Sequence, residues 1–335
     1  MRTEETGVSI GGSTARLQRT RVAGSVCAML TLGVVLACDD GSSDARQAPG
    51  TSAQSPDPIT VPTTLPGTDA DWAIMQEQAR WAFTNGLDTL PIGQIVARIG
   101  ERFVGTPYAP HTLEVAGEES LVIELQELDC VTFVENVLAL ARFVRSVPEA
   151  MLDDPVRHQA YYSGLLQNIR YRDGNLDGYP TRLHYFSEWI SDKHTRGLVW
   201  NLSHELGGVP DDEPIDFMTT HPDAYRQFGE DPAFLPAFQE IEARLNSEPR
   251  HYVPQDRIAE VADQIQDGDL IAATSTVAGL DIAHTGIALW KDGQLHLLHA
   301  PLVDGVVEVS ELSLADRVQG IGGQDGIMVA RPLDP

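Results

Sequence analysis

The chain has 335 residues, with 49 acidic and 23 basic side chains and a formal net charge of −26. A charge of this size argues against nucleic acid or an acidic membrane surface as a partner. The acidic residues are spread along the chain, which indicates a solubilising surface. The length allows a sizeable hydrophobic core.

Residues 1–38 have the features of a lipoprotein signal peptide. Arginines precede a short apolar stretch, Val22–Ala37, which is too short for a confident membrane span. The stretch runs into Cys38, and the four residues 35–38 resemble a bacterial lipobox. We therefore predict that Cys38 is lipidated and anchors the chain without crossing the bilayer. The alternative is an ordinary signal peptide with an incidental cysteine.

Residues 39–71 are rich in Ser, Thr, Pro, Gly and Asp, which predicts a disordered linker. The folded domain is then 72–335. Helical spacing of apolar residues predicts helices over Trp72–Asn85 and Pro91–Arg102, and the second has proline in its first turn. The run Ser120–Leu125 is typical of a strand.

A third helix is predicted to begin at Cys130. Asp129 is a suitable N-cap, and Pro148 marks the end. Apolar residues form one stripe, so we expect an amphipathic helix. The stripe consists of Val134, Val137, Leu138, Ala141 and Val144.

Cys130 is predicted to be the one free thiol of the mature protein. Cys27 and Cys38 both fall in the signal segment. Exported proteins tend to pair their cysteines, so a single thiol indicates reactivity. Its place at a helix start should favour the thiolate.

The segment of about 149–255 is predicted to be a large, mainly helical insert. Its helical stretches are Ala160–Arg170, His184–Lys193 and Ala233–Asn246. Turn-forming residues separate them.

The last eighty residues or so change to a strand pattern. The expected strands are Asp269–Thr274, His284–Lys291, Gln294–Ala300, Val306–Val309 and Gly326–Arg331. Asp292 and Gly293 predict a hairpin turn. Helices followed by antiparallel strands indicate the α+β class.

Two histidines are placed to act with the thiol. His284 heads one strand of the hairpin and His299 ends the other, so their side chains can meet across the strands. His296 alternates to the opposite face, and we expect it at the surface or in packing. A thiol, a base and a group that orients the base are the parts of a cysteine hydrolase.

Metal-dependent hydrolysis is not indicated. His204-Glu205 is not followed by a second histidine at helical spacing, and no glycine-rich phosphate loop is present. We therefore predict no metal and no cofactor.

The motifs resemble those of the NlpC-type papain-like cysteine peptidase superfamily of cell-wall hydrolases. The resemblance rests on Asp129-Cys130, Gly268–Leu270, His284–Ile287 and His299-Ala300. Within the superfamily, the N-acetylmuramoyl-L-alanine amidase-like branch is suggested by Gly105–Tyr108, Leu128–Asn136 and Arg182–Trp189. The likeness extends over Trp72–Pro332.

The resemblance implies an α+β, papain-like NlpC-type fold. N-terminal helices, including the nucleophile helix, would pack on an antiparallel sheet, with the insert added. Cys130 would attack an amide carbonyl, His284 would be the base, and His299 would orient His284. The Cys130 backbone N–H would stabilise the oxyanion.

Five further residues are candidates for substrate binding: Tyr108, Asp129, Arg182, His184 and Tyr185. Tyr108 matches a tyrosine beside the nucleophile in the superfamily, with simple packing as the alternative. Asp129 would serve first as the N-cap. Arg182 would pair with a stem-peptide carboxylate or have a structural role, and His184 and Tyr185 would contact sugar or peptide.

We therefore expect a cysteine-dependent amidase that cleaves the N-acetylmuramic acid–L-alanine bond of peptidoglycan or muropeptides. It would be a monomeric, periplasm-facing lipoprotein of the bacterial cell envelope. One alternative is a stem-peptide endopeptidase of the same superfamily. Another is a non-catalytic lipoprotein that binds muropeptides.

Overall fold

Residues 66–302 and 305–335 are described by a computed structural model of the chain. The predicted signal peptide, the lipidation site Cys38 and most of the linker lie outside the described residues. Within them, no helix has the length and apolar character needed to cross a bilayer. Helix α1 (Asp69–Thr84) starts three residues earlier than expected, capped by Thr68.

An eight-stranded sheet forms the centre of the domain. In spatial order its strands are β2 (Val209–Pro210), β3 (His251–Pro254), β8 (Gln324–Pro332), β4 (Leu270–Ser275), β5 (Ile282–Lys291), β6 (Gln294–His299) and β7 (Glu308–Val309), with β1 (Val199–Asn201) paired to β8. All pairings are antiparallel. The expected α+β class is confirmed, and the five predicted strands lie close to β4–β8.

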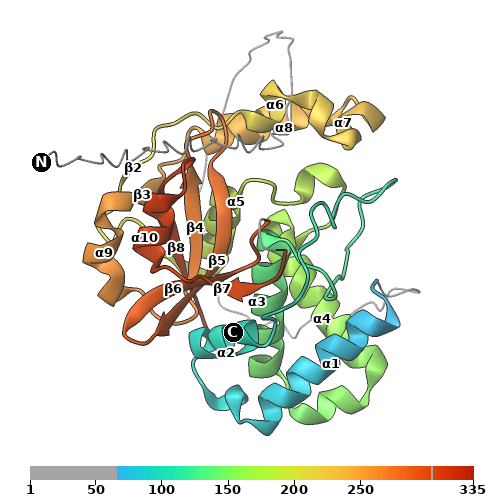
Figure 1. Ribbon diagram of the computed structural model, residues 1–335. Coiled ribbons are helices and arrows are strands. Elements are labelled where there is room, and N and C mark those ends of the chain that lie inside the picture. The colour runs from blue at the N-terminus through green and yellow to red at the C-terminus, as the bar shows by residue number, and fades with distance from the viewer. Residues whose placement is uncertain (1–65, 303–304) are drawn as a thin grey trace, which may run out of the picture.

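Helix α3 (Cys130–Ser146) packs on one face of this sheet, surrounded by α1, α2 (Ile92–Glu101) and α4 (Pro155–Arg170) (Figure 1). The expectation of an amphipathic helix is wrong. Every residue from Thr132 to Val144 is buried, because helices cover the sides that the sheet leaves open.

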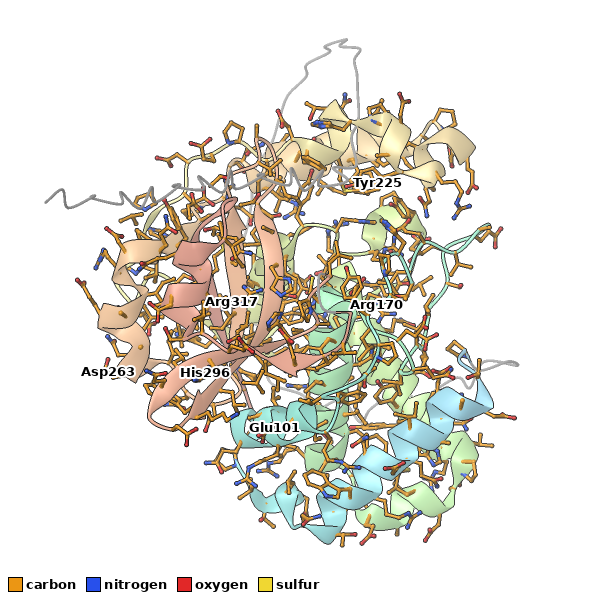
Figure 2. The ribbon with its side chains drawn as sticks, in the orientation of Figure 1. Glu101, Arg170, Tyr225, Asp263, His296 and Arg317 are labelled. Carbon is orange, nitrogen blue, oxygen red and sulfur yellow. The ribbon has the colours of Figure 1, made fainter. Side chains whose placement is uncertain are left out.

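Polar side chains on α3 therefore need partners inside the protein. Glu135 pairs with Arg170 of α4, which lies beside α3 (Figure 2), at 2.7 Å between carboxylate and guanidinium. Both side chains are at most 2% exposed. Asn136 accepts a hydrogen bond from the Tyr162 hydroxyl at 2.7 Å and donates one to the Thr132 carbonyl. These contacts fix how α3 and α4 pack.

The strand predicted at Ser120–Leu125 is also wrong, since this segment has no strand partner. Its backbone groups are bound by side chains instead. Asp71 accepts a hydrogen bond from the Leu125 amide at 2.9 Å, and Arg170 donates to the Val122 carbonyl. An extended apolar run needs a neighbouring strand to become a strand, and the sequence does not show whether one is near.

The opposite face of the sheet is covered by α9 (Ile258–Val261) and α10 (Leu314–Gly320) (Figure 1). The sheet therefore has one hydrophobic core on each face, and successive residues of a strand alternate between them. Ala272 and Ile287 lie in the core on the α3 side, and the adjacent Ile271 and Ala288 lie in the core on the α10 side. Neither α9 nor α10 was predicted.

The insert is divided between several layers. Its α5 (Phe186–Thr195) packs in the core with α3, while α6 (Phe217–Thr220), α7 (Arg226–Glu230) and α8 (Phe234–Leu245) form a separate aromatic core at one end of the sheet (Figure 1). The insert also supplies β1, β2 and β3. The region is thus mainly helical, as expected, but three of its segments are strands of the central sheet.

Removing Glu135 should cost far more stability than removing an exposed carboxylate. In Glu135→Ala the Arg170 charge stays buried without its partner, so the free energy of unfolding should fall by about 3 to 5 kcal/mol. Glu77→Ala is the control, because its ion pair with Arg102 lies at the surface, and its cost should be under about 1 kcal/mol. Urea unfolding measures both, and equal losses would contradict this packing argument.

Candidate active site

Cys130 is the first residue of α3, and Asp129 holds it there. One carboxylate oxygen of Asp129 accepts hydrogen bonds from the amides of Val131 and Thr132, at 3.0 and 2.7 Å. The Thr132 hydroxyl in turn accepts from the Asp129 amide at 2.9 Å, which completes a capping box. The predicted N-cap is confirmed. Cys130 is partly exposed and is the one free cysteine of the described residues.

The two predicted histidines meet beside this helix start. Nε2 of His284 lies 2.9 Å from Nδ1 of His299, and the rings are nearly perpendicular, at 89°. The hairpin register pairs Ile287 with Leu298. Continued by one step, it makes His284 and His299 diagonal neighbours on one face of the sheet. The second ring nitrogen of His284, Nδ1, is not used in this bond.

Thr285 links the histidine strand to the cysteine. Its hydroxyl donates to the Cys130 carbonyl at 2.7 Å, so β5 is held against the first residue of α3. No hydrogen bond joins the Cys130 sulfur to the His284 ring among the described contacts. Contacts of this kind are commonly loose before a substrate binds and tighten in the complex.

The site is arranged for neutral groups. Burial raises the pKa of the Cys130 thiol to about 11, and the Asp129 charge adds to the effect. Burial lowers the pKa of His284 to about 3, with a further contribution from the Arg317 charge. The expectation that the helix start would favour a resting thiolate is therefore wrong, because burial and Asp129 outweigh it. The proton remains on sulfur until a reaction draws it away.

The Cys130 amide is the candidate oxyanion donor at the helix start. The first-turn amides of Val131 and Thr132 are taken by Asp129, whereas the Cys130 amide is directed at its own sulfur. A carbonyl carbon attacked by that sulfur would place its oxygen near this N–H.

Tyr108 lies beside the cysteine, as the sequence indicated. Burial raises its pKa, and the nearby charges of Cys130 and Asp129 raise it further, so its hydroxyl stays protonated. The Tyr108 amide donates to the Gly305 carbonyl at 2.7 Å, which fixes the loop that carries it.

Arg182 does not offer its guanidinium to a substrate. It is 4% exposed, bonds Glu114 and the Leu113 carbonyl, and lies 3.5 Å from Glu119. Its guanidinium carbon lies over the Tyr179 ring, 4.9 Å from the ring centre. Arg182 thus joins the insert to the 113–119 loop, and the expected contact with a stem-peptide carboxylate is corrected to a structural role.

Tyr185 is also an internal residue. It is 2% exposed, and its hydroxyl donates to Glu242 at 2.7 Å and accepts from the Met218 amide at 2.8 Å. It has no surface to present to sugar or peptide, so that expectation is corrected as well. His184 remains partly exposed, although its Nε2 donates to the Tyr179 carbonyl at 3.0 Å and its ring packs on Phe238.

Two charged residues near the histidines were not predicted. Arg317 of α10 lies beside the strands of the sheet (Figure 2). Burial lowers the pKa of its guanidinium, and the charges of Glu308 and Cys130 raise it in part. Glu308 of β7 pairs in register with His299. Ser313 and Asp316 form a helix-start signature that could have revealed α10.

His296 is buried, with Nδ1 bonded to the Ser310 carbonyl, so it has the packing role expected.

A metal centre is not found within the described part of the chain, which contains no group of three or more His, Cys, Asp or Glu side chains able to hold an ion. The chemistry available at this site is that of a thiol beside a hydrogen-bonded imidazole pair.

The family model described as N-acetylmuramoyl-L-alanine amidase-like matches residues 98–324. The chain belongs to this family. The matched residues include Cys130, His284 and His299. None of the curated proteins matches the chain.

The chain is also similar to several solved structures. An N-acetylmuramoyl-L-alanine amidase from Bacteroides uniformis is 34% identical, with a TM-score of 0.67 over 72% of this chain and 99% of that one. A Bacteroides fragilis protein with a provisional xylanase designation is 36% identical, with a TM-score of 0.63 over 69% and 98%. A Legionella pneumophila protein, 21% identical with a TM-score of 0.55 over 78% and 98%, shows the fold alone.

Acid should destabilise the protein through its buried histidines. The pKa of His299 is lowered to about 2 by burial and by the charges of His284 and Arg317, and that of His284 to about 3. Below about pH 6.5 the unfolded chain therefore binds more protons than the folded protein. The free energy of unfolding should decrease as the pH is lowered, by about 2 kcal/mol per histidine between pH 7 and pH 5.

Urea unfolding of wild type and His299→Asn at both pH values tests this expectation. The variant should lose about 2 kcal/mol less than wild type between pH 7 and 5. His111→Asn, at an exposed position, is the control and should lose as much as wild type. An identical loss in all three proteins would contradict the burial of a neutral His299.

Proposed function

We propose that this amidase-like family member is a cysteine-dependent amidase that cleaves the bond between N-acetylmuramic acid and L-alanine in peptidoglycan or muropeptides. The observation that carries the proposal is the hydrogen bond between His284 of β5 and His299 of β6, together with the hydrogen bond by which Thr285 of β5 ties the His284 strand to Cys130. The amidase-like family and the Bacteroides uniformis structure support the choice of bond.

The first half of the reaction forms a thioester. The Cys130 thiol gives its proton to Nδ1 of His284 as the sulfur attacks the lactyl carbonyl of muramic acid. The Cys130 N–H stabilises the oxyanion. His284, now an imidazolium held by His299, gives its proton to the nitrogen of L-alanine, and the C–N bond breaks. The stem peptide leaves with a free amino terminus.

The second half releases the sugar. A water molecule gives a proton to the neutral His284 and attacks the thioester carbonyl. The tetrahedral intermediate collapses, the C–S bond breaks, and the proton returns to sulfur. The products are a muramic acid carboxylate and the intact peptide.

We further propose that the domain has the papain-like NlpC-type arrangement. The supporting features are the nucleophile at the start of a central helix, the antiparallel sheet on which this helix packs, and the base on a strand of that sheet. The insert would then be an elaboration that shapes the substrate groove.

Glycoside hydrolysis suits the site poorly, despite the provisional name of the Bacteroides fragilis protein. Xylan cleavage uses two facing carboxylates, whereas this site has a helix-start cysteine whose carbonyl is bound by the residue after His284, and a hydrogen-bonded His284–His299 pair. Asp129 is engaged as the helix cap. The stem-peptide endopeptidase uses the same chemistry and differs only in the bond that is cut. The non-catalytic binding protein would retain the site without turnover.

Cys130→Ala should lower turnover of defined muropeptides by at least about 10³-fold, because the nucleophile is removed. Mass spectrometry of the wild-type products decides the bond. Release of the intact stem peptide with N-terminal L-alanine is expected. His111→Asn should retain wild-type turnover.

Three outcomes would contradict the proposal. A product that keeps L-alanine on the sugar indicates the endopeptidase. Undiminished turnover by Cys130→Ala removes the thiol from the mechanism. Binding without turnover by wild type favours the non-catalytic protein.

We also propose that the protein is a periplasm-facing lipoprotein of the bacterial envelope, anchored through Cys38. The lipobox-like residues that end at Cys38 support this. Cys38→Ala should move the protein from the membrane fraction to the soluble fraction, and the mature wild-type N-terminus should carry a lipid by mass. An unmodified wild-type N-terminus would contradict the anchor.

A further inference from the structure

His299 has an unused nitrogen on the side away from His284. His299 is 1% exposed, and its Nε2 has no hydrogen-bond partner among the described residues. Among the described residues, a carboxylate oxygen of Glu308 lies 3.8 Å from this nitrogen. His299 and Glu308 are register partners on β6 and β7, so their side chains lie on the same face of the sheet.

The roles of the two histidines determine where their protons lie. For His284 to accept the thiol proton at Nδ1, its own proton must be on Nε2. That N–H then donates to Nδ1 of His299, at 2.9 Å. His299 therefore carries its proton on Nε2, and this buried N–H needs an acceptor.

We propose that Glu308 is a positioning residue, whose carboxylate accepts the Nε2–H of His299 and stabilises the positive charge that forms on the histidine pair during the reaction. This inference rests on the proposed function, because it assigns His284 as the base. The Glu308 side chain is 34% exposed and borders a cavity of about 480 Å³, so it has room to rotate and shorten the 3.8 Å separation.

Arg317 makes this carboxylate necessary. Its guanidinium borders the same cavity, and its charge lowers the pKa of His284 and His299 in addition to the effect of burial. Its Nη1 is buried and finds no hydrogen-bond partner in the part of the chain that the structure describes. An imidazolium formed here would face the fixed positive charge of Arg317. The Glu308 carboxylate is placed to offset the charges of both the imidazolium and the guanidinium.

The other groups that act on the thiol are Tyr108, Asp129 and Arg317, with Thr285 as a neutral donor. None of them is changed by a substitution at Glu308. A shift in thiol reactivity in Glu308→Gln would therefore report on the histidine pair.

The test is the rate of Cys130 alkylation by iodoacetamide in the full chain between pH 5 and 11. Glu308→Gln keeps the shape of the side chain and removes its charge. Near pH 7, where the thiolate forms with His284 as proton acceptor, the variant should react about tenfold more slowly, equivalent to one pKa unit. At pH 11 hydroxide removes the proton, and the two rates should converge.

Glu311→Gln is the matched control, since Glu311 lies three residues away at the surface, and its profile should follow wild type. Coincident profiles of Glu308→Gln and wild type would overturn the proposal. A deficit of equal size at every pH would also overturn it, because a general structural disturbance would have that effect.

A second measurement needs no variant. Histidine ¹⁵N shifts of the wild-type protein report the tautomer, and His299 should be protonated at Nε2 and unprotonated at Nδ1. A proton on Nδ1 would overturn the assignment even if Glu308→Gln failed to fold. Neither measurement uses muropeptide turnover, so absence of turnover would defeat the proposed function without altering this result.

Discussion

The complete burial of α3 is the constraint on which the rest of the structure depends. If α3 were exposed, the proposed nucleophile at its start would move with the helix. Here the sheet lies on one side and α1, α2 and α4 on the others, while Asp129 caps the start and Thr285 binds the first carbonyl. Burial also requires that Glu135 be matched by Arg170, which ties the helix to the insert.

The same burial sets the electrostatics of the site. In a low-dielectric surrounding the thiol and both imidazoles stay neutral, so in the proposed mechanism charge appears only when a proton moves from sulfur to His284. The environment must then receive charge that it does not hold at rest. Arg317 opposes that charge on the histidines, and in our proposal Glu308 favours it, so the α10 side of the sheet would take part in the chemistry.

The insert illustrates why residue type alone does not assign a role. Arg182 and Tyr185 have the chemistry of ligand-binding residues, yet both are buried. Arg182 bonds Glu114, which is 68 positions away, and Tyr185 bonds Glu242, 57 positions away. An arginine binds whichever carboxylate the fold brings to it, and no local pattern reveals distant partners. His184 alone of the three keeps part of its surface exposed.

The sequence by itself determined the features that depend on near neighbours: the N-cap at Asp129, the hairpin that brings His284 and His299 together, and the α+β class. These follow from turn chemistry, strand alternation and capping, which act over a few residues. Only the tertiary structure decided the all-round burial of α3, the neutral resting thiol, and the place of Glu308 and Arg317 beside the histidines. Those properties arise from contacts between segments far apart in the chain, where burial and charge depend on what packs against each group.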